Sequence, residues 1–237
     1  MKVLVGLILL LSFRVCLAFE SDLISERPGQ ALSPNCLNRG NIQIQAGVDL
    51  NSYSYNLNST LSNTIIRFGM GEKFEINTGY NYQINSEILQ SPILGFKMTV
   101  LKKQKHQIAI QYNTVINQLN KEPYSNSFKL ISAHKLSSKA ELTCNAGVDY
   151  TPVFDTMSGH YVVSFSINPT NKIGLVFENY GTFNTSFNTY FDLGIGFLIT
   201  PLLQIDTYFG GGLKDKVEEA FISCGFTYRF EFKNNND

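Results

Sequence analysis

The sequence of 237 residues carries 19 Lys and Arg against 19 Asp and Glu, so its formal net charge is zero. This balance excludes proteins that bind nucleic acid through a basic surface, because such proteins need an excess of Lys and Arg to neutralise phosphates. Four Cys and three His are too few for a disulfide scaffold or an array of zinc fingers.

Residues 1–18 have the pattern of a signal peptide. Lys2 gives a positive start, Val3–Phe13 is an apolar run, and Cys16–Ala18 supplies small residues at the cleavage position. A membrane anchor is the alternative, but a spanning helix needs about 20 apolar residues, and Arg14 interrupts this run. We therefore expect residues 1–18 to be removed on export.

Residues 19–39 form a polar stretch with two prolines ahead of the first predicted strand. We expect this stretch either to remain in the periplasm as a tail or to tuck into the lumen of the barrel predicted below. An ion pair between Arg27 and an inward-facing carboxylate would favour the second arrangement. Arg27 is therefore the candidate for a plug.

From residue 41 onward, apolar and polar residues alternate with period two. Over residues 74–84, Phe, Ile, Thr and Tyr fall on one face, whereas Glu, Asn, Gly and Gln fall on the other. A helix, with its period of about 3.6, cannot place these side chains on one side. The pattern predicts about twelve strands of roughly ten residues, long enough for a tilted strand to cross a bilayer. We place them at 41–55, 62–70, 73–84, 92–102, 106–117, 126–136, 139–151, 159–168, 172–182, 187–199, 202–213 and 219–232.

The connections between these strands alternate in length. Short turns such as Gly71-Glu72 follow the even strands, and longer polar loops such as Asn56–Thr60 and Pro152–Ser158 follow the odd ones. This alternation is typical of outer-membrane barrels. A soluble β-sandwich is the alternative, but its strands usually have only about five or six residues. We predict an all-β, transmembrane, antiparallel up-and-down barrel over residues 40–232, followed by a polar tail at 233–237.

Several stretches carry a family resemblance. Glu26-Arg27-Pro28 is an acidic-Arg-Pro motif, and a link with a second proline leads from it to the alternating strand Asn41–Gly47. Asn63–Gly69 followed by Lys73–Ile76 has the form of a second hairpin, and Gly225–Phe230 that of a last strand. Together they resemble the outer-membrane β-barrel family named after the phenol-degradation MetA-pathway protein. The resemblance implies a transporter.

The polar faces of the predicted strands point into such a barrel. Their charged and amide residues are candidates for lining the lumen, namely Asp49, Arg67, Glu75, Asn77, Lys97, Lys129, Glu141, Asp149, Glu178, Asp192, Asp206 and Arg229. One interpretation is that they pair with one another and fill the lumen, because polar groups away from bulk water need partners. The other is that they line a pathway for polar or amphipathic solutes. Both arrangements are known for barrels of this size.

No residue pattern indicates catalysis, and we expect no cofactor and no metal site. The three His residues, His106, His134 and His160, do not cluster by spacing. Ser132 and His134 share a strand face, as a hydrolase would require, but no third group that would orient the base is evident.

The sequence therefore predicts a channel or transporter for small solutes, aromatic and amphipathic ones among them, in the cell outer membrane. A structural or adhesive barrel with a filled lumen is the first alternative, and an outer-membrane lipid hydrolase is the second. The expected partners are outer-membrane lipid, a small-molecule solute and the barrel insertion machinery, with no nucleic acid.

Overall fold

A computed structural model describes residues 23–53, 56–83, 88–115, 125–152, 155–212 and 220–231. The predicted signal peptide and the polar tail at 233–237 lie outside these residues. Twelve strands make up nearly all of the described part. They are β1 (Ile42–Tyr53), β2 (Asn56–Gly69), β3 (Phe74–Gln83), β4 (Ile88–Lys102), β5 (His106–Val115), β6 (Ser125–Lys135), β7 (Ala140–Thr151), β8 (Thr156–Ile167), β9 (Ile173–Phe183), β10 (Phe187–Thr200), β11 (Leu203–Gly212) and β12 (Ala220–Phe230).

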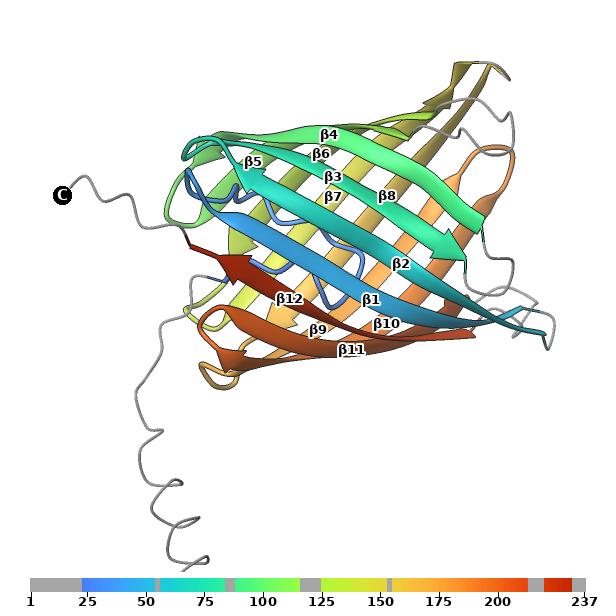
Figure 1. Cartoon of the computed structure of the whole chain (residues 1–237). Helices are drawn as coiled ribbons and strands as arrows, with labels where there is room; N and C mark the ends of the chain where they lie inside the picture. Colours follow the sequence, from blue (N-terminus) through green and yellow to red (C-terminus); the bar gives the residue numbers. More distant parts are fainter. Residues whose placement is uncertain are drawn as a thin grey trace, which may run out of the picture.

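Each strand pairs antiparallel with the strands before and after it, and β12 pairs with β1 to close the barrel (Figure 1). The closing pair runs in unbroken register from Ile42 opposite Phe230 to Ser52 opposite Ala220. Closure leaves no strand with an unpaired edge. The predicted all-β up-and-down barrel is confirmed. In the described part of the chain, no helix is long and apolar enough to span a membrane.

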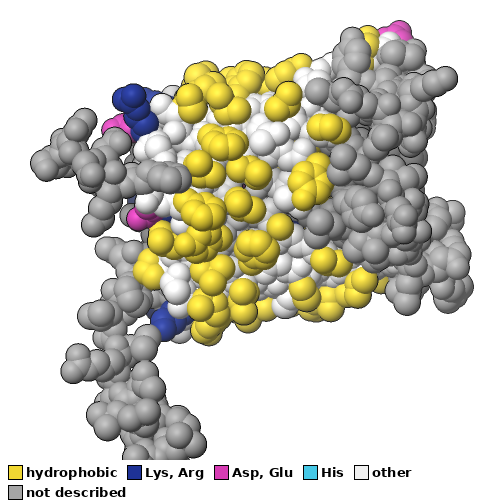
Figure 2. Space-filling view, in the orientation of Figure 1, with side chains coloured by type: hydrophobic (Ala, Val, Ile, Leu, Met, Phe, Trp, Pro, Cys, Tyr) yellow, Lys and Arg dark blue, Asp and Glu magenta, His cyan; other side chains and the backbone are white. Residues whose placement is uncertain are grey.

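The alternation of side chains sorts the strands into an apolar outside and a polar inside. In β10, Leu193 and Ile195 point outward and are 49% and 42% exposed, whereas Asp192 is 3% exposed and Gly194 is buried. Figure 2 shows hydrophobic side chains spread over the wall, with charged groups at the end where β1 begins. Such an apolar outer surface is suited to contact with lipid tails.

The barrel has two different ends. At the turn end, short connections join β2 to β3, β4 to β5, β6 to β7, β8 to β9 and β10 to β11. The start of β1 also lies there, because the Gly69 amide donates to the Asn41 carbonyl across 2.9 Å. The opposite end is the loop end. The predicted difference in length is not general: only the connections after β5 (116–124) and β11 (213–219) are longer than those at the turn end, whereas those after β1 (54–55) and β9 (184–186) are as short.

Two of the predicted loops are wrong in extent. Asn56–Thr60 belongs to β2 and pairs with β1, with Asn56 opposite Tyr53 and Thr60 opposite Asp49. The last residues of the second predicted loop, Thr156–Ser158, likewise begin β8 and pair with β7. Backbone hydrogen bonds between strands do not depend on side-chain polarity, so a strand can continue beyond the apolar band as a polar stretch.

Candidate functional site

Residues 23–41, called the inner segment from here on, lie ahead of β1, and they run inside the barrel as far as Leu37, with residues 38–40 exposed (Figure 1). Hydrogen bonds connect the segment to one strand after another around the wall. Ser25 contacts β12, Arg27 contacts β11, Gln30 and Ala31 contact β9, Leu32 contacts β7, Pro34 contacts β4, and Leu37 contacts β3. The segment therefore runs around the lumen and returns to the turn end, where β1 starts.

The first half of the inner segment is residues 23–33. Arg27 is its most buried residue, with 6% of its surface exposed. Its Nε donates to Asp206 Oδ1 across 3.1 Å, and its Nη2 donates to Ser223 Oγ across 2.9 Å. Its guanidinium carbon lies 5.3 Å from the centre of the Tyr208 ring, and its carbonyl accepts a hydrogen bond of 2.7 Å from Gln204. The wall thus offers Arg27 both a counter-charge and an aromatic face.

Inward-facing glycines leave the space that Arg27 and Pro28 occupy. A Cβ atom added at Gly47 would lie 2.5 Å from Arg27 Nη2, and one at Gly225 would lie 2.6 Å from its Nε. A Cβ atom at Gly194 would lie 2.7 Å from Pro28 Cβ. These three positions belong to β1, β12 and β10. Any larger residue at them would compete with the inner segment for room.

Four charged side chains join the inner segment to β2, β3 and β4. Glu75 accepts hydrogen bonds of 2.8 Å from Arg67 Nε and Nη2, and its Oε1 lies 3.2 Å from Lys97 Nζ. Glu26 from the inner segment pairs with Lys97 and lies 3.8 Å from Arg67. The cluster holds two acids and two bases, so its charges balance. The Leu37 amide also donates to Glu75 across 2.8 Å.

The second half of the inner segment, residues 34–41, starts with three buried residues, Pro34, Cys36 and Leu37. Leu37 and Cys36 are 1% and 6% exposed, and Pro34 is fully buried. The Thr99 hydroxyl donates to the Pro34 carbonyl across 2.7 Å. Burial raises the pKa of the Cys36 thiol. This half is held by apolar burial as well as by hydrogen bonds, and it leads directly into β1.

Two further wall residues hold the middle of the inner segment. Glu178 accepts hydrogen bonds from the amides of Gln30 and Ala31, the second across 3.2 Å. Asn145 accepts from the Leu32 amide across 2.7 Å and donates back to the Leu32 carbonyl across 3.2 Å. The backbone of residues 30–32 is therefore fixed at mid-height across the barrel.

The inner segment divides the lumen into two cavities. The loop-side cavity has a volume of about 530 Å³ and the turn-side cavity a volume of about 290 Å³. Glu26, Arg27 and Leu32 line both cavities, so the segment is a partition only one chain thick at these residues.

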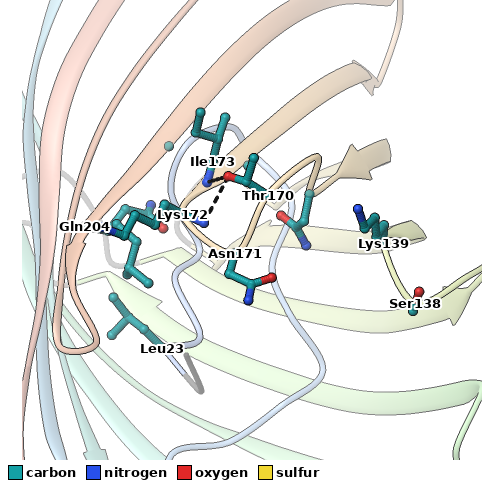
Figure 3. Close-up of a pocket in the computed structure, with 12 residues that line it drawn as sticks. Leu23, Ser138, Lys139, Thr170, Asn171, Lys172, Ile173 and Gln204 are labelled. Atoms are coloured by element: carbon teal, nitrogen blue, oxygen red, sulfur yellow. Dashed lines mark hydrogen bonds between the residues drawn. The ribbon is translucent and has the colours of Figure 1, made fainter. Parts of the chain in front are cut away.

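A third hollow, the rim pocket, lies at the turn end and has a volume of about 270 Å³. It shares Leu23, Gly196 and Gln204 with the turn-side cavity. Figure 3 shows Leu23 of the inner segment facing this pocket together with the turn that precedes β9, where Thr170 Oγ1 accepts hydrogen bonds of 3.2 and 3.1 Å from the amides of Lys172 and Ile173. The turn-side cavity thus lies next to a pocket at the turn end of the barrel.

The structure brings several of the lumen candidates against the inner segment. Arg67, Glu75 and Lys97 belong to the charged cluster, Asp206 binds Arg27, and Glu178 binds the backbone of residues 30 and 31.

The other candidates occupy different parts of the lumen face. Asn77, Lys129 and Asp149 line the loop-side cavity, and Glu141 lines the turn-side cavity. Arg229 pairs with Glu231 across 2.7 Å, and Asp49 is half-buried. Asp192 lies opposite Glu178 in the register, and both of its carboxylate oxygens are buried with no hydrogen-bond partner among the described residues.

Sequence reasoning missed the residues that form the recess for Arg27. Tyr208 and Ser223 carry no sequence signal for this role, because each is an ordinary inward position of an alternating strand. Gly47 and Gly225 do carry one, since each stands between two larger polar residues on its inward face, and Gly194 is followed on its inward face by a second glycine, Gly196.

The His and Ser residues considered for catalysis lie elsewhere. His106 and His134, far apart in spacing, are register partners on β5 and β6, with their Nδ1 atoms 2.9 Å apart. His160 Nδ1 lies 3.0 Å from Asp149 Oδ2. Ser132 Oγ donates to the Cys144 carbonyl across 3.4 Å. Within the described ranges, no group of three or more His, Cys, Asp or Glu side chains is placed to hold a metal ion.

Comparisons with known proteins agree with this architecture. The model of a family described as "Putative MetA-pathway of phenol degradation" matches residues 25–230. Among curated proteins, none matches the sequence.

Three solved structures illustrate the likeness in fold. The KdgM porin is 7% identical, with a TM-score of 0.65 over 80% of this chain and 99% of that one. The COG4313 outer membrane channel from Pseudomonas putida F1 is 9% identical, with a TM-score of 0.64 over 86% and 100%. The CymD monoaromatic hydrocarbon channel is 9% identical, with a TM-score of 0.53 over 83% and 89%.

Proposed function

The chain belongs to the phenol-degradation MetA-pathway family, and we propose that it is an outer-membrane channel for small solutes whose lumen is closed at mid-height by the inner segment. Contact with outer-membrane lipid and delivery by the barrel insertion machinery are part of the proposal. It assigns no catalytic role to Ser132, whose hydroxyl is engaged with a backbone carbonyl.

The composition of the two faces supports a channel. The outside carries Leu, Ile, Val and Phe side chains suited to lipid, and the inside carries amides, hydroxyls and charges suited to water. The solved structures with this fold include a porin and two channels. A solute moving through the lumen would meet polar groups on every strand.

The observation that carries the proposal is the pair of cavities on either side of one stretch of chain. Glu26, Arg27 and Leu32 line both of them. If the first half of the inner segment moved aside, the two cavities would join. The turn-side cavity already borders the rim pocket, with which it shares Leu23, Gly196 and Gln204. The second half, with Cys36 and Leu37 buried, would stay in place.

A structural barrel with a permanently filled lumen is the second candidate. The charged cluster of Glu26, Arg67, Glu75 and Lys97 favours it, because breaking a buried ion pair leaves an uncompensated charge and costs about 3–5 kcal/mol. The two candidates differ in whether the first half of the inner segment can leave the wall.

Liposome permeability separates them. We expect liposomes with the wild-type protein to admit arabinose faster than empty liposomes, and Arg27→Ala or deletion of residues 19–39 to raise the rate further. Arg39→Ala is the matched control, because Arg39 is an exposed arginine of the same segment. Rates equal to those of empty liposomes in all four proteins would favour the filled structural barrel.

A further inference from the structure

The loop-side cavity has one apolar side within an otherwise polar lumen. Ile65 on β2, Ile93 on β4 and Val115 on β5 all line it. They lie at one level, because Ile65 and Ile93 both pair with Gly79 on β3, and Ile93 pairs with Val115. All three are half-buried, so part of each side chain faces the cavity. We call this group the apolar shelf.

A cation lies on the next strand. Lys129 on β6 lines the same cavity and pairs with Gln111 on β5, two inward positions from Val115 toward the turn end. Among the described residues, Lys129 is in none of the ion pairs and in none of the hydrogen bonds made by side chains. Its ammonium group thus has no direct polar partner among those residues.

The other charged groups around the cavity already have partners. Glu26 pairs with Lys97, and Arg27 pairs with Asp206. Asp149 accepts from His160 across 3.0 Å. Neither Glu26 nor Asp149 forms an ion pair with Lys129. Of the Lys, Arg, Asp and Glu side chains that line the cavity, Lys129 is thus the one with neither an ion pair nor a hydrogen bond to a described residue.

The size and surface of the cavity define the molecule that it fits. A volume of about 530 Å³ is in the range of sites for small ligands. The apolar shelf favours a ring or chain without hydroxyls, because a buried hydroxyl against Ile and Val would have no hydrogen-bond partner. Lys129 favours a carboxylate, which forms a strong charge-assisted hydrogen bond with an ammonium group.

We propose that the loop-side cavity binds small ring carboxylates, with the carboxylate on Lys129 and the ring on the apolar shelf. As a statement about solute class, the inference rests on the proposed channel function. A sugar acid would satisfy Lys129 but would place hydroxyls on the shelf. A neutral aromatic would satisfy the shelf but would leave Lys129 without a direct partner.

Binding to the detergent-solubilised full chain tests the site without requiring transport. The probes are benzoate, its neutral analogue benzamide and the ringless acetate. Saturation-transfer NMR detects their binding, and equilibrium dialysis measures their affinities. We expect wild-type protein to bind benzoate at least tenfold more tightly than benzamide or acetate. Lys129→Gln should lower the affinity for benzoate to that for benzamide and leave the affinity for benzamide unchanged. Lys129→Arg should retain the preference for benzoate over benzamide.

Ile93→Asn, which places an amide in the apolar shelf, should weaken the binding of benzoate and of benzamide to the same extent. Lys105→Gln is the control, because Lys105 is an exposed lysine in the turn before β5. Heat-modifiable migration on gels verifies that each variant is folded. Equal affinity for benzoate and benzamide, or an unchanged benzoate affinity in Lys129→Gln, would overturn the assignment of the site.

Benzoate uptake by liposomes then separates the two proposals. If benzoate binds as expected but does not enter liposomes, even with residues 19–39 deleted, the proposed channel function is contradicted and the proposed binding site is not. If arabinose enters rapidly and benzoate binds no more tightly than benzamide, the proposed binding site is contradicted and the proposed channel function is not.

Discussion

At the scale of single residues, Arg27 and the glycines around it decide whether the first half of the inner segment stays on the wall. The guanidinium is buried beside Asp206, Ser223 and Tyr208, in space that Gly47 and Gly225 leave open. Separating a buried guanidinium from its carboxylate leaves a charge without compensation. Arg27 is therefore either fully docked or fully displaced into the wet lumen.

Gly47→Ala tests this directly. The new methyl group would lie 2.5 Å from Arg27 Nη2, and all of the nearest atoms at that position belong to the end of the flexible Arg27 side chain. We expect Arg27 to leave while the wall keeps its shape, so that arabinose permeability in liposomes rises and heat-modifiable migration is unchanged. Cys36, which is anchored separately, should stay slow to react with a maleimide in a Cys144→Ser, Cys224→Ser background.

Gly71→Ala is the matched control for that experiment, because a Cβ atom at Gly71 would meet nothing within 4 Å. Permeability of Gly47→Ala equal to that of Gly71→Ala would show that Arg27 does not hold the partition. Rapid Cys36 labelling in Gly47→Ala would show that the two halves of the inner segment leave together.

At the scale of the strands, the alternation of residues assigns each side chain to lipid or lumen. Ile76 points outward and is 39% exposed, whereas its neighbour Asn77 points inward and lines the loop-side cavity. An arginine on the lipid face near the bilayer midplane costs about 2–4 kcal/mol. Ile76→Arg should lose that much folding free energy, and Asn77→Arg should lose little, as measured by urea unfolding in lipid vesicles.

Leu193→Arg, on the opposite side of the barrel, should behave like Ile76→Arg, because Leu193 is 49% exposed on the outside. Equal losses for Ile76→Arg and Asn77→Arg would mean that the inside and the outside of the strands are assigned wrongly.

The same alternation explains how much of the fold was predictable. Period two depends only on neighbouring residues, so the strands, their number and the short turns could be predicted from the sequence. The start of β2 could not, because four of the five residues in Asn56–Thr60 are polar and the strand pairing of this stretch depends on β1. Loop predictions fail where a strand continues past the apolar band.

Contacts of the inner segment could be predicted only in outline. Arg27 was a reasonable plug candidate, but the pairing of Ser25 with Thr227 spans 202 positions and that of Arg27 with Asp206 spans 179. Local patterning cannot select one inward carboxylate among many at such separations. The partner of each polar side chain is fixed by the register of the closed barrel and by where glycines leave room.

At the scale of the whole molecule, a closed barrel separates a lipid-facing surface from a polar interior, and the chain that enters it divides that interior in two. The segment arrives from the turn end, crosses the lumen at mid-height and returns to start β1. One cavity then lies on the loop side of the inner segment, and the other lies on its turn side, next to the rim pocket.

The most direct test of this division is the single-channel conductance of the mature chain in planar lipid bilayers, with and without residues 19–39. We predict small conductance steps for the intact chain and steps several-fold larger for the shortened one, because removing the partition joins the two cavities into one pathway. Identical conductance in the two proteins, or no conductance in either, would contradict the account.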